Sequence, residues 1–66
     1  MLPDGVYDVL IVDAVDGRLE VTITTGDHKG EVVMLRGSFE GKDDIDLLAE
    51  PATLTVTDGV PHLRLG

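Results

Sequence analysis

Cysteine and tryptophan are absent from this chain of 66 residues, and its only aromatic side chains are one tyrosine and one phenylalanine. Without cysteine there is no disulfide framework, no thiolate ligand for zinc and no thiol nucleophile. With so few flat rings, the chain offers little surface on which nucleobases could stack, and we expect Tyr7 and Phe39 to serve as core or lid residues. The interior must therefore be aliphatic, since valine, leucine and isoleucine make up most of the 42% of residues that are hydrophobic.

Positive charge is also scarce. The chain has five lysine and arginine residues and 13 aspartate and glutamate residues, which gives a formal net charge of −8. A surface of this sign repels phosphate backbones and anionic lipid headgroups. No apolar run approaches the roughly 20 residues that span a membrane, and residues 1–4 lack the basic and apolar parts of a signal peptide. We therefore expect a cytoplasmic protein without membrane contact. Nucleic acid is a disfavoured partner, and another protein or a second copy of the chain is a favoured one.

The length of the chain limits how much core it can build. A domain of this size buries roughly 60% of the surface that its unfolded chain exposes. We therefore predict that residues 1–66 form a single small domain with a thin core. Such a domain is marginally stable or gains support from a partner chain.

Five segments have the alternation or the β-branched content of strands. They span residues 6–13, 19–25, 31–36, 52–57 and 60–65. Asp16-Gly17 and Asp58-Gly59 are pairs typical of tight hairpin turns, and residues 26–30 connect the second and third segments. The first segment carries apolar residues on both faces, which predicts a central strand or a strand that bends and changes face.

One short helix is predicted before the fourth strand. Asp43 or Asp44 would cap its start, and Pro51 would end it at Glu50, because the residue before a proline is pushed out of the α region. Its apolar positions follow helical spacing: Ile45, Leu48 and Ala49. A helix of two turns does not hold in isolation, so we expect this stripe to plug the sheet. Residues 38–42 are expected to form a loop.

The order of elements is three antiparallel strands, a short helix and a two-stranded hairpin. This is the order of the OB-fold, a five-stranded Greek-key barrel, so we predict an all-β, OB-like barrel. An SH3-like barrel or a β-sandwich fragment is the alternative. The segments Gly5-Val6-Tyr7 and 26–32 resemble small uncharacterised bacterial proteins of actinobacterial type and, more loosely, the opening strands of phage single-strand-binding proteins. The first group implies no known activity.

No pattern of residues in the sequence matches a known type of catalytic or metal site. Residues 43–46 hold three aspartates, but the spacing of an EF-hand loop is missing, and carboxylates at a helix start are explained by the helix dipole. Ser38 is the only serine, and neither His28 nor His62 has a nucleophile at a recognisable spacing. We therefore predict a protein that is not an enzyme, with no cofactor and no catalytic or metal site.

The third strand is the candidate interaction surface. Residues 32–35 are apolar at every position, so either Val33 and Leu35 or Val32 and Met34 are left outside the barrel, beside an open edge. The alternative is a central strand covered on both sides by the helix and loop. We single out four residues as the surface: Val33, Met34, Leu35 and Arg36.

These features predict a non-catalytic interaction module, with self-association as one of its forms. The alternative is a degenerate single-stranded nucleic-acid-binding OB protein of phage or plasmid type, which the charge and the missing rings oppose. A third reading is that the acidic surface mimics nucleic acid and occupies a basic protein.

Overall fold

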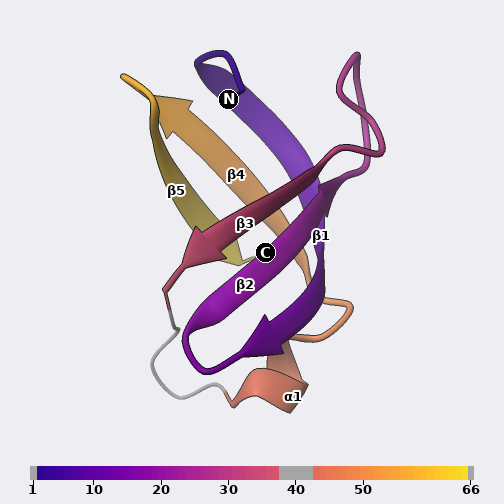
Figure 1. Ribbon diagram of the computed structural model, residues 1–66. Coiled ribbons are helices and arrows are strands. Elements are labelled where there is room, and N and C mark those ends of the chain that lie inside the picture. Colours follow the sequence, from indigo (N-terminus) through magenta and orange to yellow (C-terminus); the bar gives the residue numbers. More distant parts are fainter. Residues whose placement is uncertain (1, 38–42, 66) are drawn as a thin grey trace.

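The computed structural model describes residues 2–37 and 43–65, which form five strands and one short helix (Figure 1). The elements are β1 (Gly5–Val15), β2 (Arg18–Ile23), β3 (Val32–Arg36), α1 (Asp44–Leu47), β4 (Pro51–Thr57) and β5 (Val60–Leu65). The predicted loop 38–42, with Ser38, Phe39 and Lys42, lies outside the described residues.

All five strands belong to one antiparallel sheet in the order β3-β2-β1-β4-β5. The sheet curls into a half-barrel, with β3 and β5 as its two edges and α1 at one end (Figure 1). The all-β prediction is confirmed, and the arrangement is consistent with an OB-like barrel that is open between β3 and β5.

β1 is the central strand, and it changes face partway along its length. Val9 and Ile11 point inward, the register then shifts, and Ala14 is the next buried residue. Val12 stands at the shift without a partner on β2 and is 42% exposed. One extra residue in a strand exchanges its two faces, so Ala14 turns inward although it is three residues after Ile11. Val6, an apolar residue of the other face before the shift, is exposed. Both readings of this segment are confirmed together.

Both two-residue turns have the conformation that their sequences predict. Asp16 and Gly17 have φ angles of 49° and 79°, and Asp58 and Gly59 have φ angles of 52° and 75°. Positive φ at both central positions defines the hairpin turn that matches the twist of the flanking strands. The Asp4 carboxylate accepts hydrogen bonds from the backbone N–H groups of Asp58 (2.8 Å) and Gly59 (3.1 Å), which ties the N-terminal segment to the second turn.

The core is wholly aliphatic, as the composition predicts. Among the described residues it comprises Val9, Ile11, Ala14, Leu19, Val21, Ile23, Leu47, Ala52, Leu54 and Val56. β1, β2 and β4 supply all of these side chains but one, which comes from α1. The concave face of the three middle strands therefore holds the fold together, and neither edge strand contributes a fully buried residue.

The predicted helix differs from the observed one in length and in its buried side chain. α1 is a single turn, and Leu47, which is 2% exposed, is the residue that enters the core. Ile45 and Leu48 of the predicted stripe are 77% and 45% exposed. The prediction that this apolar stripe packs on the sheet was wrong, because a helix of one turn is too short for residues at helical spacing to form a common face.

Pairing with β1 ends α1 well before Glu50. The N–H of Ala49 donates to the Ile11 carbonyl (2.8 Å), and the Ile11 N–H donates to the Glu50 carbonyl (3.0 Å). Ala49 takes a positive φ of 62° to make this connection. The predicted start is confirmed: Asp43 is the N-cap, and its N–H donates to the carboxylate of Asp46 (3.3 Å).

Candidate functional site

β3 is an edge strand with one face turned inward and the other exposed. Val33 lies opposite Val21, and Leu35 lies opposite Leu19, both of which are buried on β2. Directly opposed residues in a sheet point to the same side, so Val33 and Leu35 are half-buried and pack against the core. Val32 and Met34 are 56% and 63% exposed on the convex face. The alternative of a central strand covered on both sides is therefore wrong.

Hydrogen bonds at both ends of the β2–β3 ladder fix which backbone groups of β3 face outward. Ile23 N donates to Glu31 O (2.9 Å), Gly30 N to Ile23 O (2.8 Å), and Gly37 N to Gly17 O (2.7 Å). Bonding alternates along an antiparallel strand, so Val33 and Leu35 bond to β2. The N–H and C=O groups of Val32, Met34 and Arg36 consequently point away from β2, along the open edge.

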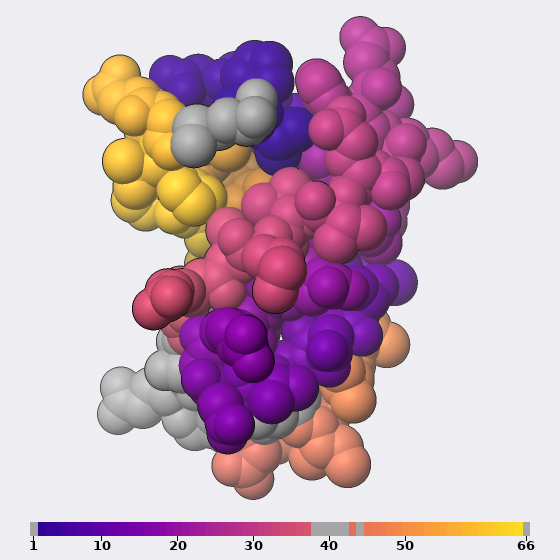
Figure 2. Space-filling model, in the orientation of Figure 1, coloured from indigo at the N-terminus to yellow at the C-terminus, as the bar shows by residue number. Residues whose placement is uncertain are grey.

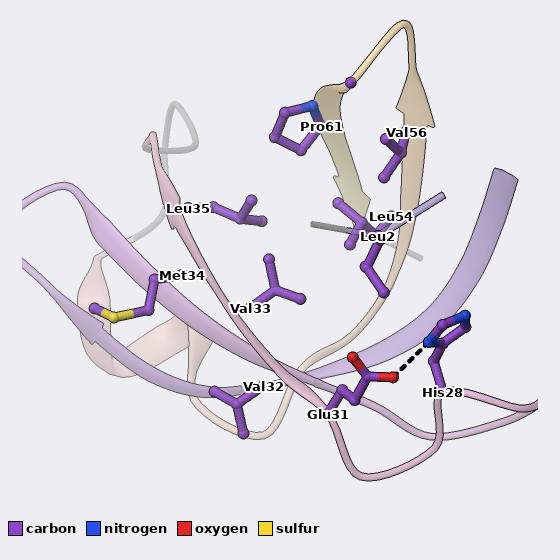
Figure 3. A pocket seen from close by; sticks show the side chains of 11 residues that line it. Leu2, His28, Glu31, Val32, Val33, Met34, Leu35, Leu54, Val56 and Pro61 are labelled. Carbon is purple, nitrogen blue, oxygen red and sulfur yellow. Dashed lines mark hydrogen bonds and ion pairs between the residues drawn. The ribbon is translucent and has the colours of Figure 1, made fainter. Parts of the chain in front are cut away.

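A groove lies between β3 and the β4–β5 hairpin, and its volume is about 490 Å³. In Figure 3, the side chains of Val33 and Leu35 point into it from β3, whereas those of Val32 and Met34 point away. The opposite wall is also mainly apolar and includes Leu2, Leu54, Val56 and Pro61. The space-filling view, in the orientation of Figure 1, shows β3 crossing the front, with β5 beside it (Figure 2). This volume lies within the range of ligand-binding clefts.

A small polar cluster stands at the end of the groove where β3 begins. Nδ1 of His28 contacts a carboxylate oxygen of Glu31, and both residues line the groove. The His28 ring also packs edge to face on Tyr7, with centroids 5.8 Å apart at 79°. The Tyr7 hydroxyl donates to the Pro3 carbonyl. Tyr7 is half-buried against the core, which confirms its predicted place. His62, on β5, is exposed opposite Thr55.

Two arginines meet at the other end of β3, and the acidic residues Asp13 and Glu20 line a small hollow together with Arg18. Arg18 and Arg36 lie directly opposite each other on β2 and β3, and both are exposed. The composition predicts only that positive charge is scarce, and it gives no sign that these two arginines are paired. The lengths of the strands and of the 26–30 connection determine which residues of β2 and β3 lie opposite each other. That register can be calculated only when the bulge at Gly30 and Glu31 is known, and the sequence alone does not reveal it.

The four predicted surface residues do not share one face. Val33 and Leu35 line the groove with their side chains, and Met34 and Arg36 lie on the convex face. The wall across from them, built by Leu54 and Val56, was predicted only as core. It became part of a site because the sheet stays open between its two edges.

No group of three or more histidine, aspartate or glutamate side chains in residues 2–37 and 43–65 is placed to hold a metal ion. Within the same ranges, no helix is long and apolar enough to cross a membrane.

No family model matches the chain, and no curated protein or solved structure matches it either. The resemblance of segments 5–7 and 26–32 to bacterial and phage proteins gains no support from these comparisons. The groove and the free edge of β3 are the features of the described residues that indicate a function.

Proposed function

We propose that this protein is a non-catalytic interaction module that binds another protein along the edge of β3 and in the adjoining groove. The observation that carries the proposal is the position of three outward-pointing backbone units beside an apolar groove of about 490 Å³. A free strand edge next to apolar surface is the arrangement to which an extended chain adds. A cytoplasmic location is part of the proposal, and the absence of cysteine is compatible with it.

The two edges of the sheet differ in how well they are protected against pairing. Sheet edges are commonly blunted by proline or by charged side chains. β5 carries Pro61, which lacks an N–H group, near its start. β3 carries Val32 and Met34, and its one charged residue is Arg36 at the end. The less protected edge is therefore the one that adjoins the groove.

Selection of binders from a random peptide library, followed by amide chemical-shift mapping, tests this function. We expect selected peptides to shift the amide signals of Val32, Met34 and Arg36. Met34→Pro removes the central N–H of the free edge and should weaken binding at least tenfold, whereas Met34→Val keeps that N–H and should bind normally. Binders that map to the convex face of β1 and β4 would contradict the proposal, as would a library that yields none.

Self-association is the second form of the same function. Stable interfaces bury roughly 1,200–2,000 Å² in total, which a five-residue strand does not reach without the groove. The net charge of −8 on each copy also opposes it. Sedimentation velocity over a range of concentrations decides this point, and a strict monomer at millimolar concentration would eliminate self-association.

Single-stranded nucleic acid is a second candidate, favoured by the OB-like strand order and by the opposed Arg18 and Arg36. Titration of a labelled oligonucleotide at low salt tests it. Binding that weakens steeply with added salt would support this candidate, because phosphate contacts release counterions. The absence of binding at about 20 mM salt would remove it.

A further inference from the structure

We infer that the groove binds an extended peptide that pairs antiparallel with β3, inserts aliphatic side chains opposite Val33 and Leu35, and carries an acidic residue opposite Arg36. This inference rests on the proposed function and adds the chemistry and direction of the partner. It follows from the backbone, the groove and the charge in turn.

The backbone of β3 selects an extended chain as the occupant. The N–H and C=O groups of Val32, Met34 and Arg36 point along the open edge, and an added strand satisfies both kinds of group at once. A small apolar ligand would fill the groove but leave these groups to water. Antiparallel pairing is the more stable arrangement per residue, and it is how every pair of neighbouring strands in this sheet is joined.

The groove determines which peptide side chains are apolar. Residues opposite Val33 and Leu35 point to the same side as these two and enter the groove. There they face the opposite wall, where Pro61 is exposed and Leu54 and Val56 are buried. Aliphatic side chains at two alternating positions match this lining, and the position between them faces Met34 on the exposed side.

The charge at the end of β3 gives the peptide its polarity. Arg36 and Arg18 stand side by side there, in a protein whose net charge is −8. At the other end of β3, Glu31 is in contact with His28. In an antiparallel peptide, the residue opposite Arg36 precedes the two aliphatic residues. An acidic side chain at that position lies beside the Arg36 guanidinium group, with Arg18 one strand further away.

A second copy of β3 fits this edge less well. Its outward backbone positions are Val32, Met34 and Arg36, so pairing two β3 edges would bring a valine, a methionine or an arginine opposite Arg36. None of these neutralises the arginine pair. Charge complementarity therefore favours a peptide from another protein over self-pairing.

The test uses a synthetic peptide with blocked ends and the sequence Ser-Glu-Val-Thr-Val-Thr-Ser. We expect it to shift the amide signals of Val32, Met34 and Arg36 and to show nuclear Overhauser contacts between its valines and Pro61. Changing its Glu to Lys should weaken binding about fivefold at low salt. Arg36→Glu should reverse that preference. Arg64→Glu, which changes the net charge equally on another strand, should keep it.

Backbone methylation separates strand pairing from simple apolar contact. The N–H of the central threonine points to the Met34 carbonyl, so its methylation should weaken binding at least tenfold. Methylation of a valine nitrogen, which points away from β3, should have a smaller effect. No binding at about 1 mM, a parallel orientation or an unchanged charge preference in Arg36→Glu would overturn the inference. If library-selected peptides still map to β3 in that case, the proposed function stands and only the partner's chemistry is wrong.

Discussion

Asp4 connects two segments that lie 54 residues apart, through bonds from its carboxylate to the Asp58–Gly59 turn. Two hydrogen bonds to a charged acceptor at an exposed site contribute about 1 kcal/mol or somewhat more to stability. They also hold in place the N-terminal segment, whose Leu2 forms part of the groove wall. A single exposed carboxylate thus supports both the hairpin and the site.

Replacement of Asp4 by alanine should therefore lower the free energy of unfolding by about 1 kcal/mol. Chemical denaturation monitored by circular dichroism measures it. Asp27→Ala is the matched control, because it removes the same charge from an exposed loop residue and should leave stability nearly unchanged. Equal effects of the two substitutions would show that charge removal, not the turn bonds, is responsible.

At the scale of elements, α1 contributes to the core through one side chain, that of Leu47. Leu47 is almost completely buried, and Ile45, two residues earlier, is 77% exposed. We expect Leu47→Ala to lower the free energy of unfolding by about 2–4 kcal/mol, because it removes buried methyl groups and leaves a cavity. Ile45→Ala should change it by no more than about 0.5 kcal/mol. Thermal and denaturant unfolding of the two variants, compared side by side, checks the prediction, and a larger loss for Ile45→Ala would restore the stripe that the sequence predicts.

β3 allows a similar comparison between neighbouring residues. The Val33 N–H bonds to β2, so Val33→Pro removes a ladder hydrogen bond and should cost at least about 2 kcal/mol. The Met34 N–H points to the open edge, where proline is tolerated, so Met34→Pro should cost about 1 kcal/mol or less. Denaturation of both variants measures the difference. Similar losses would mean that the edge of β3 is not free.

The strands could be predicted from the sequence wherever one face is apolar and the other polar. β2 and β4 alternate cleanly, and both have the predicted inward faces. β3 could not be assigned a face, because residues 32–35 are all apolar and its orientation depends on pairing with Leu19 and Val21. The groove could not be predicted from the sequence for a related reason. It joins β3 to Leu54 and Val56, which are remote in sequence and meet only through the curl of the sheet.

At the scale of the whole molecule, the excess of carboxylates opposes folding. Thirteen acidic and five basic residues share a domain with a thin aliphatic core. Bringing like charges together in the folded state costs free energy, and salt screens charges that lie farther apart than the Debye length. That length is about 30 Å at 0.01 M and 10 Å at 0.1 M ionic strength. The longest dimension of the described chain is 30 Å, so low salt leaves repulsion acting across the entire protein.

Raising the sodium chloride concentration from about 10 mM to 300 mM should therefore raise the melting temperature by several degrees. For a domain of this size, about 1 kcal/mol corresponds to roughly 4–8 °C. Thermal unfolding followed by circular dichroism measures the change, and a matching series in sucrose controls for general solvent exclusion. Arg64→Glu, which makes the net charge more negative, should lower the melting temperature at low salt and steepen the dependence. A melting temperature that falls as salt is added would mean that attractive ion pairs, rather than repulsion among carboxylates, dominate the electrostatics of this fold.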